Sequence, residues 1–357
     1  MDIASAIRKF LDEKIDFSDI HAQSKDCLRV RVHGDLAAVT DEMLDDEDIV
    51  AFLKSVVYED TVHSLSESKG DMSFAFSFHG ARFRCELSWQ GGLQLQSMVL
   101  RRLNEHIPSF DEIGLPMVAK GFAERSKGLI IVTGRTGSGK STTLASMIDY
   151  INGTLPGKVI TIEDPIEYKH ISKKCMITQR EVGKDTRDFA YGLRAALRQD
   201  PDIIMVGEIR DKETVDAALS ASETGHLVLA TLHTPNAKQS VERITGFYEG
   251  EEKGWVLNVL SSVLIGVMSQ VLVRRNGGGR RLACEVLVNT DAVAQMIREN
   301  KVAQLQNLII TGKNAGMITL NAVLADMARK NEISMQEALY AAYDIAELRK
   351  DLGLAHG

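Results

Sequence analysis

Residues 134–141 form a glycine-rich run whose residue types suit the binding of a nucleoside triphosphate. They read Gly-Arg-Thr-Gly-Ser-Gly-Lys-Ser, which matches the pattern GxxxxGK followed by Ser or Thr. Glycines let the backbone wrap closely enough around phosphates to offer many N–H donors, and the following helix adds its positive end. We predict that this run and the residue after it bind ATP through eight residues: Gly134, Thr136, Gly137, Ser138, Gly139, Lys140, Ser141 and Thr142.

Lys140 and Ser141 close this run and have separate expected roles. Lys140 is expected to reach the outer phosphates, and the Ser141 hydroxyl is expected to ligate Mg²⁺. The run follows an apolar strand at 128–133 and opens a helix at 141–152. A strand before the motif and a helix after it are the context in which the motif binds phosphate.

Acidic residues follow two other predicted strands. Glu208 comes after the strand 203–206, and Glu163, Asp164 and Glu167 come after the strand 159–162. Ligands of open α/β sheets bind at the carboxyl ends of the strands. Glu208 is therefore placed to hold Mg²⁺ through water or to polarise the attacking water. One such loop is equally well a solvated turn, but two beside a phosphate loop favour a catalytic function.

Two histidines, His226 and His233, bracket the predicted strand 227–232. Neither has metal-ligand spacing to a second ligand. From their spacing alone, both are interpreted as ordinary polar residues.

The elements that position these residues divide into two regions and a connection. Residues 1–100 are predicted to form a small α+β domain, and residues 101–117 are predicted to be a linker. The N-terminal elements are a helix at 3–11, a strand at 28–32, a helix preceded by the acids 45–48, and a hairpin of strands 73–78 and 82–88.

Residues 118–357 are predicted to form an α/β domain, because short apolar runs separated by helical stretches indicate a parallel sheet. The apolar stretch 256–273 is interrupted by polar residues and is predicted to be a buried helix rather than a membrane span. A strand–turn–strand pattern covers 270–288, and the chain is predicted to be helical from about 290 to 357.

The composition argues against several classes of protein. The chain has 357 residues, and 42 Lys and Arg against 49 Asp and Glu give a net charge of −7. This balance argues against a nucleic-acid protein with a wholly basic surface. The four cysteines form no CxxC pair, so a tetra-cysteine zinc site is excluded and a reducing cytoplasm is indicated. No signal peptide is expected.

Four blocks of the sequence together resemble the secretion and type IV pilus ATPase superfamily. They are the phosphate loop at 134–142, an acidic block at 161–168, a second acidic strand at 197–211 and a histidine block at 224–234. The segments 18–21 and 31–35 resemble the first domain of that family. The resemblance covers nearly the whole chain, and the set of blocks is far more specific than the phosphate loop alone.

The resemblance implies a fold and an assembly. The fold is α/β, with a PAS-like α+β N-terminal domain and a RecA-like P-loop ATPase domain that carries added C-terminal helices. The assembly is a ring of six subunits with ATP bound where the two domains meet, and the activity depends on Mg²⁺.

The resemblance also implies roles for single residues. Glu167 matches the candidate base for the attacking water, and Glu208 matches the second-strand acid near Mg²⁺. The histidine block, with His226 and His233, senses nucleotide or contacts a neighbouring subunit. The N-terminal arginines that reach the phosphates correspond to Arg82, Arg84 and Arg101. Positive charge there stabilises the phosphoryl group during transfer.

The implied activity is ATP hydrolysis that drives pilin subunits out of a type IV pilus. Assembly motors carry a tetra-cysteine zinc site and a longer N-terminal region, and their absence here favours the retraction branch. Retraction motors carry AIRNLIRE near the C-terminus, whereas residues 292–299 read AVAQMIRE. The alternatives are a motor of a secretion or conjugation apparatus, a pilus assembly motor, a RecA-like nucleic-acid translocase and a nucleotide-sensing regulator.

The resemblance further implies partners and a location. The expected partners are five copies of the same chain in a homohexamer, an inner-membrane pilus platform protein and related motor ATPases. Zinc and nucleic acid are not expected. The protein is expected in the cytoplasm, peripherally associated with the inner membrane.

Overall fold

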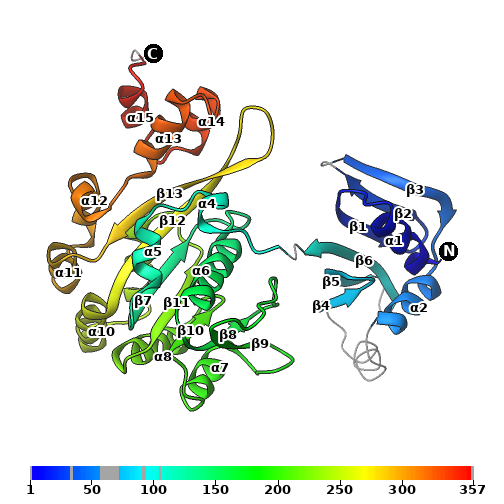
Figure 1. Ribbon diagram of the computed structural model, residues 1–357, viewed down its shortest axis with the longest axis horizontal. Coiled ribbons are helices and arrows are strands. Elements are labelled where there is room, and N and C mark those ends of the chain that lie inside the picture. The colour runs from blue at the N-terminus through cyan, green and yellow to red at the C-terminus, as the bar shows by residue number, and fades with distance from the viewer. Residues whose placement is uncertain (1, 33–34, 57–71, 91–93, 104–105, 355–357) are drawn as a thin grey trace. The chain divides into compact units, whose positions relative to one another are not determined.

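The chain forms two compact units (Figure 1). The computed structural model describes residues 2–32, 35–56, 72–90, 94–103 and 106–354. Unit 1 consists of Met1–His106 together with Pro165–Lys169, and unit 2 consists of Ile107–Asp164 and His170–Gly357.

Unit 1 is built on an antiparallel sheet with the strand order β3-β2-β1-β6-β5-β4. The strands are β1 (Phe17–Gln23), β2 (Cys27–Val32), β3 (Asp35–Met43), β4 (Met72–Phe78), β5 (Ala81–Gln90) and β6 (Gln94–Leu103). Helix α1 (Ile3–Asp12) buries Ile3, Ile7 and Phe10 at helical spacing. Helix α2 (Asp46–Val56) has three acids in its first turn, where they favour the positive end of the helix dipole.

The strands of unit 1 separate an apolar face from a charged face. In β5, Phe83, Cys85 and Leu87 are buried in the core, so the alternating residues Arg82, Arg84 and Glu86 lie on the opposite face. This alternation places the predicted arginines outside the hydrophobic core.

Unit 2 is built on a sheet with the strand order β13-β12-β7-β11-β10-β8-β9. All neighbouring strands run parallel except β12 and β13, which are antiparallel. The strands are β7 (Gly128–Thr133), β8 (Gly157–Glu163), β9 (Cys175–Glu181), β10 (Ile203–Val206), β11 (Leu227–Leu232), β12 (Leu264–Arg274) and β13 (Arg280–Val288). Strands β7, β10 and β11 are buried along their whole length, as expected for a sheet covered on both faces.

Helices cover both faces of this sheet. One core contains residues of α7 (Phe189–Ala196), α8 (Lys212–Glu223), α9 (Ala237–Thr245), α10 (Gly250–Val263), α11 (Asp291–Arg298) and α12 (Leu305–Thr311). The core on the other face contains residues of α4 (Phe110–Ile113), α5 (Val118–Ala123) and α6 (Lys140–Thr154). The sequence-based prediction of an α/β protein with an N-terminal α+β region is confirmed.

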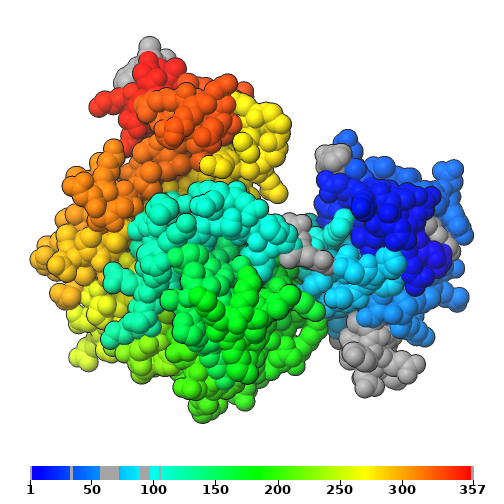
Figure 2. Space-filling model, viewed as in Figure 1, coloured from blue at the N-terminus to red at the C-terminus, as the bar shows by residue number. Residues whose placement is uncertain are grey.

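Three C-terminal helices pack on the hairpin of β12 and β13. They are α13 (Leu320–Arg329), α14 (Met335–Ala341) and α15 (Ile345–Asp351), and their small core includes Val273 and Ala283 of the two strands. Figure 2 shows these helices in orange and red beside the yellow hairpin.

Two predicted boundaries differ from the structure. The stretch 256–273 is not one helix, because α10 ends at Val263 and β12 starts at Leu264. A continuous apolar run is compatible with a buried helix or a buried strand, so its periodicity could not separate the two. Residues 101–103, assigned to the linker, instead complete β6. No helix among the described residues is long and apolar enough to cross a membrane.

Glu285 is a carboxyl group inside the core of unit 2. It lies in β13 with no exposed surface, and one of its oxygens accepts a hydrogen bond from the Ala237 N–H at 3.1 Å. Burial raises the pKa of Glu285 to about 7 from an ordinary value of 4.5. The folded state therefore retains a proton that the unfolded state releases, and the stability contribution of this group falls as the pH rises from 4.5 through 7.

We expect Glu285→Gln to raise the free energy of unfolding at pH 8, by up to about 3 kcal/mol, because the amide removes the cost of ionising a buried acid. At pH 5 the gain should be much smaller. Urea denaturation of both proteins at the two pH values measures the difference. An equal change at both pH values would contradict the assignment.

Candidate active site

Four loops of unit 2 begin at one edge of the sheet. They follow β7, β8, β10 and β11, and these strands pair in register, with Thr133 opposite Leu232 and Val206 opposite both Ile162 and Ala230. The phosphate loop, Glu163, Glu208 and His233 therefore all lie at the carboxyl edge, where α/β sheets bind ligands.

The phosphate loop has the geometry of an anion cradle. Gly134, Gly137 and Gly139 have φ angles of +146°, +77° and +89°, which side chains rarely tolerate. Helix α6 has Gly139 as its N-cap and no side chain caps its first turn, so its positive end suits the binding of an anion. The buried Lys140 ammonium donates to the carbonyls of Gly134 at 2.9 Å and Arg135 at 3.1 Å. These features fit a triphosphate.

A side chain of the neighbouring strand β12 supports this loop. The Gln270 Nε2 donates to the Ser138 carbonyl at 2.9 Å, and Gln270 has no exposed surface. A Cβ at Gly134 would lie 2.4 Å from the Gln270 carbonyl oxygen. The close approach of β12 therefore requires glycine at position 134. Gln270 was not predicted, because it lies 132 residues from Ser138 in the sequence and shows no local signal.

The structure brings Glu208 and His233 together. The Glu208 carboxylate lies 2.7 Å from Arg210 Nη2 and 3.4 Å from His233 Nε2, and only 17% of its side chain is exposed. The exposed Ser141 is the second residue of α6, at the same end of the sheet. Hydroxyl and carboxylate oxygens are ligands that Mg²⁺ prefers, so Ser141 and Glu208 fit the predicted role of binding Mg²⁺. Arg210 was not predicted.

The acids that follow β8 have different surroundings. The Glu163 carboxylate is buried and accepts hydrogen bonds from Thr161 Oγ1 at 2.7 Å and Gln179 Nε2 at 3.0 Å. Glu167 is half-buried and lies in Pro165–Lys169, the segment that groups with unit 1.

His226 does not join this site within unit 2. It precedes β11, and its carbonyl accepts a hydrogen bond from the Gly128 N–H at 3.0 Å, at the amino end of β7. The phosphate loop follows the other end of β7. The structure therefore places His226 at the amino ends of the strands and His233 at their carboxyl ends.

The three predicted arginines share one face of unit 1. Arg84 and Arg101 are directly opposite each other on β5 and β6. Arg84 Nε lies 2.6 Å from Glu86, and Arg101 Nε lies 2.8 Å from the buried Asp19 carboxylate. Burial opposes the charge on Asp19, but hydrogen bonds from Arg101 and Ser18 keep the pKa of Asp19 below its usual value. Arg82 donates to the Ile166 carbonyl at 3.1 Å.

A buried hydroxyl joins the phosphate loop to the loop that carries His233. Thr133, the last residue of β7, has no exposed surface, and its Oγ1 lies 2.6 Å from the Thr234 carbonyl oxygen and 3.0 Å from the Thr234 N–H nitrogen. The Thr234 hydroxyl also forms a hydrogen bond with Ser240 Oγ at 2.6 Å. Thr133 was not predicted, because only the fold brings it to Thr234.

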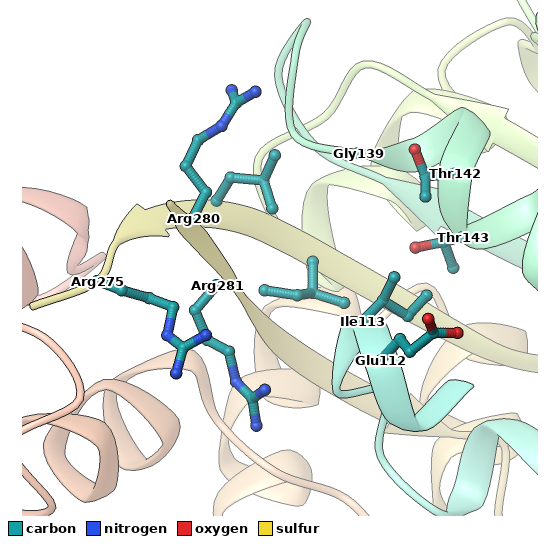
Figure 3. A pocket seen from close by; sticks show the side chains of 10 residues that line it. Glu112, Ile113, Gly139, Thr142, Thr143, Arg275, Arg280 and Arg281 are labelled. Atoms are coloured by element: carbon teal, nitrogen blue, oxygen red, sulfur yellow. The ribbon is translucent and has the colours of Figure 1, made fainter. Parts of the chain in front are cut away.

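A cavity of about 190 Å³ opens beside the start of α6 (Figure 3). Its wall combines the phosphate-loop helix, α4 and the hairpin of β12 and β13. The lining residues include Gly139, Thr142 and Glu112, together with Arg275, Arg280 and Arg281 of the hairpin. An apolar hollow with a few arginines beside a phosphate-binding loop suits the remainder of a nucleotide.

Comparisons with known proteins show the family to which this chain belongs. The chain matches the family model described as type II/IV secretion system protein over residues 7–339. It is 41% identical over 322 residues to the type IV pilus retraction ATPase PilT of Pseudomonas aeruginosa, spanning 90% of this chain and 93% of that protein. It is 40% identical over 311 residues to a twitching motility protein of Neisseria gonorrhoeae, spanning 87% of this chain and 82% of that protein.

A solved structure also matches the whole fold. The crystal structure of the pilus retraction motor PilT with bound ADP superposes with a TM-score of 0.90 at 41% identity. The match covers 98% of this chain and 99% of that chain.

We expect Thr133→Val to lower the turnover of ATP at least several-fold, because the Thr234 N–H loses its hydrogen-bond partner and the loop that carries His233 is no longer held in place. Leaving this N–H without a partner costs about 1–3 kcal/mol of free energy. Thr133→Ser should retain most of the activity. Steady-state ATP hydrolysis and the melting temperature would be measured together. Thr245→Val is the matched control, since the buried Thr245 hydroxyl bonds only to carbonyls of its own helix. Equal effects of both valine variants would contradict the prediction.

Proposed function

Because this chain belongs to the family of type II/IV secretion system proteins, we propose that it is an ATP-hydrolysing motor that powers the retraction of a type IV pilus. One observation carries this proposal: identity of 41% to a pilus retraction ATPase runs through 90% of the chain. The blocks that bind and hydrolyse ATP lie within that shared length.

The proposed chemistry assigns each group of the site a task. The phosphate loop and Lys140 hold the phosphates, and Ser141 and Glu208 hold Mg²⁺, Glu208 through water. Mg²⁺, when bound, neutralises charge that develops on the transferred phosphoryl group. Glu167 or Glu163 accepts the proton of the attacking water. His233 responds to the nucleotide through its contact with Glu208.

The arginine face of unit 1 supplies positive charge in the proposed assembly. Arg82, Arg84 and Arg101 would stabilise the phosphoryl group during its transfer. The active form is a homohexamer in which His226 meets a neighbouring subunit. A ring that couples successive hydrolysis events to domain motion provides the mechanical work.

The proposed partners follow from the mechanical task. A motor that removes pilin subunits must act on a membrane-embedded machine, so we expect it to dock on an inner-membrane platform protein from the cytoplasmic side. Related motor ATPases are further partners. Neither zinc nor nucleic acid has a role in this proposal.

A second candidate keeps the ATPase and changes the machine to a secretion, conjugation or pilus assembly apparatus. The observation that favours it is the divergent stretch 292–299, which lies on α11. Val293 and Ile297 of this helix are buried in the core of unit 2. Of the departures, Ala294 and Met296 are half-buried and Gln295 is exposed, so these three positions would alter a partner surface.

We expect deletion of the gene to cause an excess of surface pili that do not retract, restored by the wild type but not by Glu208→Gln. In purified protein, Lys140→Ala should abolish ATP binding. Glu208→Gln should bind ATP and turn it over at least tenfold more slowly, because it loses a carboxylate near Mg²⁺. Pilus counts and ATP hydrolysis are the measurements. Loss of pili on deletion would indicate an assembly motor, an unchanged count would favour a secretion machine, and undiminished hydrolysis in both variants would exclude the proposed site.

We place the nucleoside of ATP in the arginine-lined cavity beside α6. We expect Arg275→Ala to raise the KM for ATP about fivefold and to leave kcat nearly unchanged, because a guanidinium against an aromatic base contributes about 1 kcal/mol. Arg274→Ala is the matched control, since Arg274 precedes Arg275 in sequence and does not line the cavity. Steady-state kinetics would decide, and equal KM values for the two variants would remove the nucleoside from this cavity.

A further inference from the structure

We propose that Gln179 is a positioning residue that fixes both ends of the acidic loop 164–169 through a single side-chain amide. The inference rests on the proposed ATPase function and adds to it a residue on β9. Gln179 acts through Glu163 and His170, which flank the loop.

The amide of Gln179 makes one contact with each end of the loop. Its Nε2 donates to Glu163 Oε1 at 3.0 Å, and its Oε1 accepts from the His170 N–H at 2.8 Å. Glu163 is the last residue of β8, and His170 is the first residue after the segment Pro165–Lys169. The chain between these two contacts carries Asp164 and Glu167. The amide therefore fixes the distance between the two ends of the loop on which these acids lie.

The strand register explains why position 179 can make both contacts. Strands β8 and β9 are parallel, with Gln179 opposite Thr161. Thr161 lies two residues before Glu163 on the same face of the strand, and its hydroxyl donates to the same carboxylate oxygen at 2.7 Å. Glu163 Oε1 therefore accepts one hydrogen bond from its own strand and one from the neighbouring strand.

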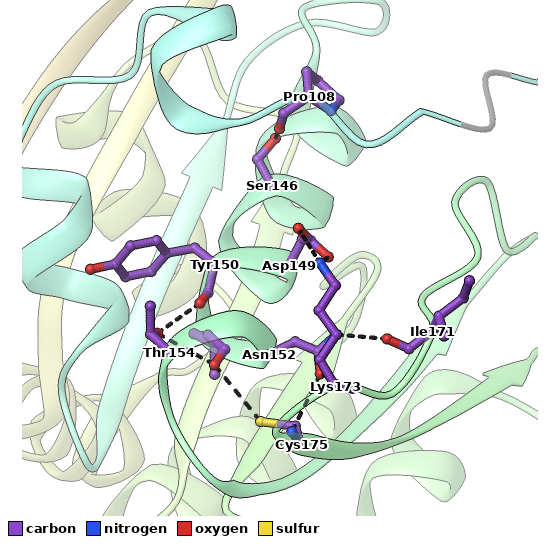
Figure 4. A network of polar contacts seen from close by, with 10 residues as sticks. Pro108, Ser146, Asp149, Tyr150, Asn152, Thr154, Ile171, Lys173 and Cys175 are labelled. Carbon is purple, nitrogen blue, oxygen red and sulfur yellow. Dashed lines mark hydrogen bonds and ion pairs between the residues drawn. The ribbon is translucent and has the colours of Figure 1, made fainter.

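The chain beyond His170 is held on the phosphate-loop helix (Figure 4). The buried Asn152 of α6 donates to the Ile171 carbonyl at 2.8 Å and accepts from the Lys173 N–H at 2.9 Å. Lys173 Nζ also lies 2.7 Å from the Asp149 carboxylate of α6. Helix α6 thus anchors residues 171–173, and Gln179 anchors the junction between them and the acidic loop.

An amide suits this position because the two contacts need a donor and an acceptor. Glu163 presents a carboxylate oxygen, and the His170 backbone presents an N–H. A methionine would fill similar space without either polar group. A glutamate could still accept from His170 but would place a second negative charge against Glu163.

Replacement of Gln179 should therefore slow the chemical step more than it weakens ATP binding. The phosphate loop holds the nucleotide through its own backbone and Lys140, whereas the acidic loop acts on the attacking water. We expect Gln179→Met to lower kcat at least tenfold and to change the KM for ATP less than twofold.

Gln179→Glu gives a readout that a merely structural role would not move. At pH 8.5 two adjacent carboxylates repel, so kcat should fall at least tenfold. Near pH 6 the pair shares one proton and carries the same single charge as the wild-type pair, so a substantial part of kcat should return relative to wild type at the same pH.

The other titratable groups around Glu163 are present in both the wild type and Gln179→Glu. Their effect on kcat therefore cancels when the kcat of the variant is divided by that of the wild type at the same pH. They are Glu181 with Lys184 on the β9 side, Asp164 in the loop, Glu208 with Arg210 and His233 after β10 and β11, and His170. Burial lowers the pKa of His170 to about 4, so its ring stays neutral over the tested range.

The experiment measures kcat and KM for MgATP from pH 6 to 8.5 in the full chain, for wild type, both Gln179 variants and Lys173→Ala. The last variant breaks the exposed pair with Asp149 and leaves Gln179 in place, so it controls for general loosening of the segment. The proposal holds if Gln179→Met lowers kcat and leaves the KM for ATP nearly unchanged, and if Lys173→Ala does not lower kcat.

Two results would overturn the proposal. One is a kcat for Gln179→Met that differs from wild type no more than that of Lys173→Ala. The other is a Gln179→Glu profile parallel to wild type across the pH range, which also decides the question if Gln179→Met does not fold. Failure of the proposed function looks different, because the wild type itself would then lack ATP hydrolysis.

Discussion

The parallel register around β7 is the constraint on which the rest of the site depends. Because Thr133, Leu232, Val206 and Ile162 end their strands at one edge, the loops that follow begin side by side. A slip in register would shift the ends of the strands relative to one another and would separate Glu208 from His233.

Buried and half-buried polar contacts then fix the loops relative to one another. Thr133 joins the phosphate loop to the His233 loop, Gln270 holds the phosphate loop on β12, and Gln179 joins Glu163 to the end of the acidic loop. A buried polar group without a partner costs about 1–3 kcal/mol, so each contact disfavours conformations that break it. The loops are therefore positioned by hydrogen bonds beneath them rather than by their own sequences.

Features with local sequence signals were predicted correctly, and features that depend on residues far apart in the sequence were not. The phosphate loop, β7, β10 and β11 were predicted because their signals are local, and the family resemblance is confirmed by the match over residues 7–339. The stretch 256–273 was predicted wrongly, since an apolar run fits either a helix or a strand. Thr133, Gln270 and Gln179 were missed because their partners lie 101, 132 and 16 residues away in the sequence. An ordinary Thr or Gln shows no sign of such a contact until the fold is known.

The two histidines of one sequence block show how the fold divides a motif. His226 and His233 lie seven positions apart across β11, and a strand rises about 3.3 Å per residue, so they are separated by roughly 20 Å. Only His233 lies at the edge that carries the phosphate loop, where it contacts Glu208. His226 instead ends the turn before β11, with its ring near the Ala221 carbonyl at 3.0 Å. One nucleotide bound at the phosphate loop cannot be contacted by both side chains of the same chain. A role for His226 in the nucleotide cycle therefore has to pass through another subunit or through β11 itself, whereas His233 can respond directly.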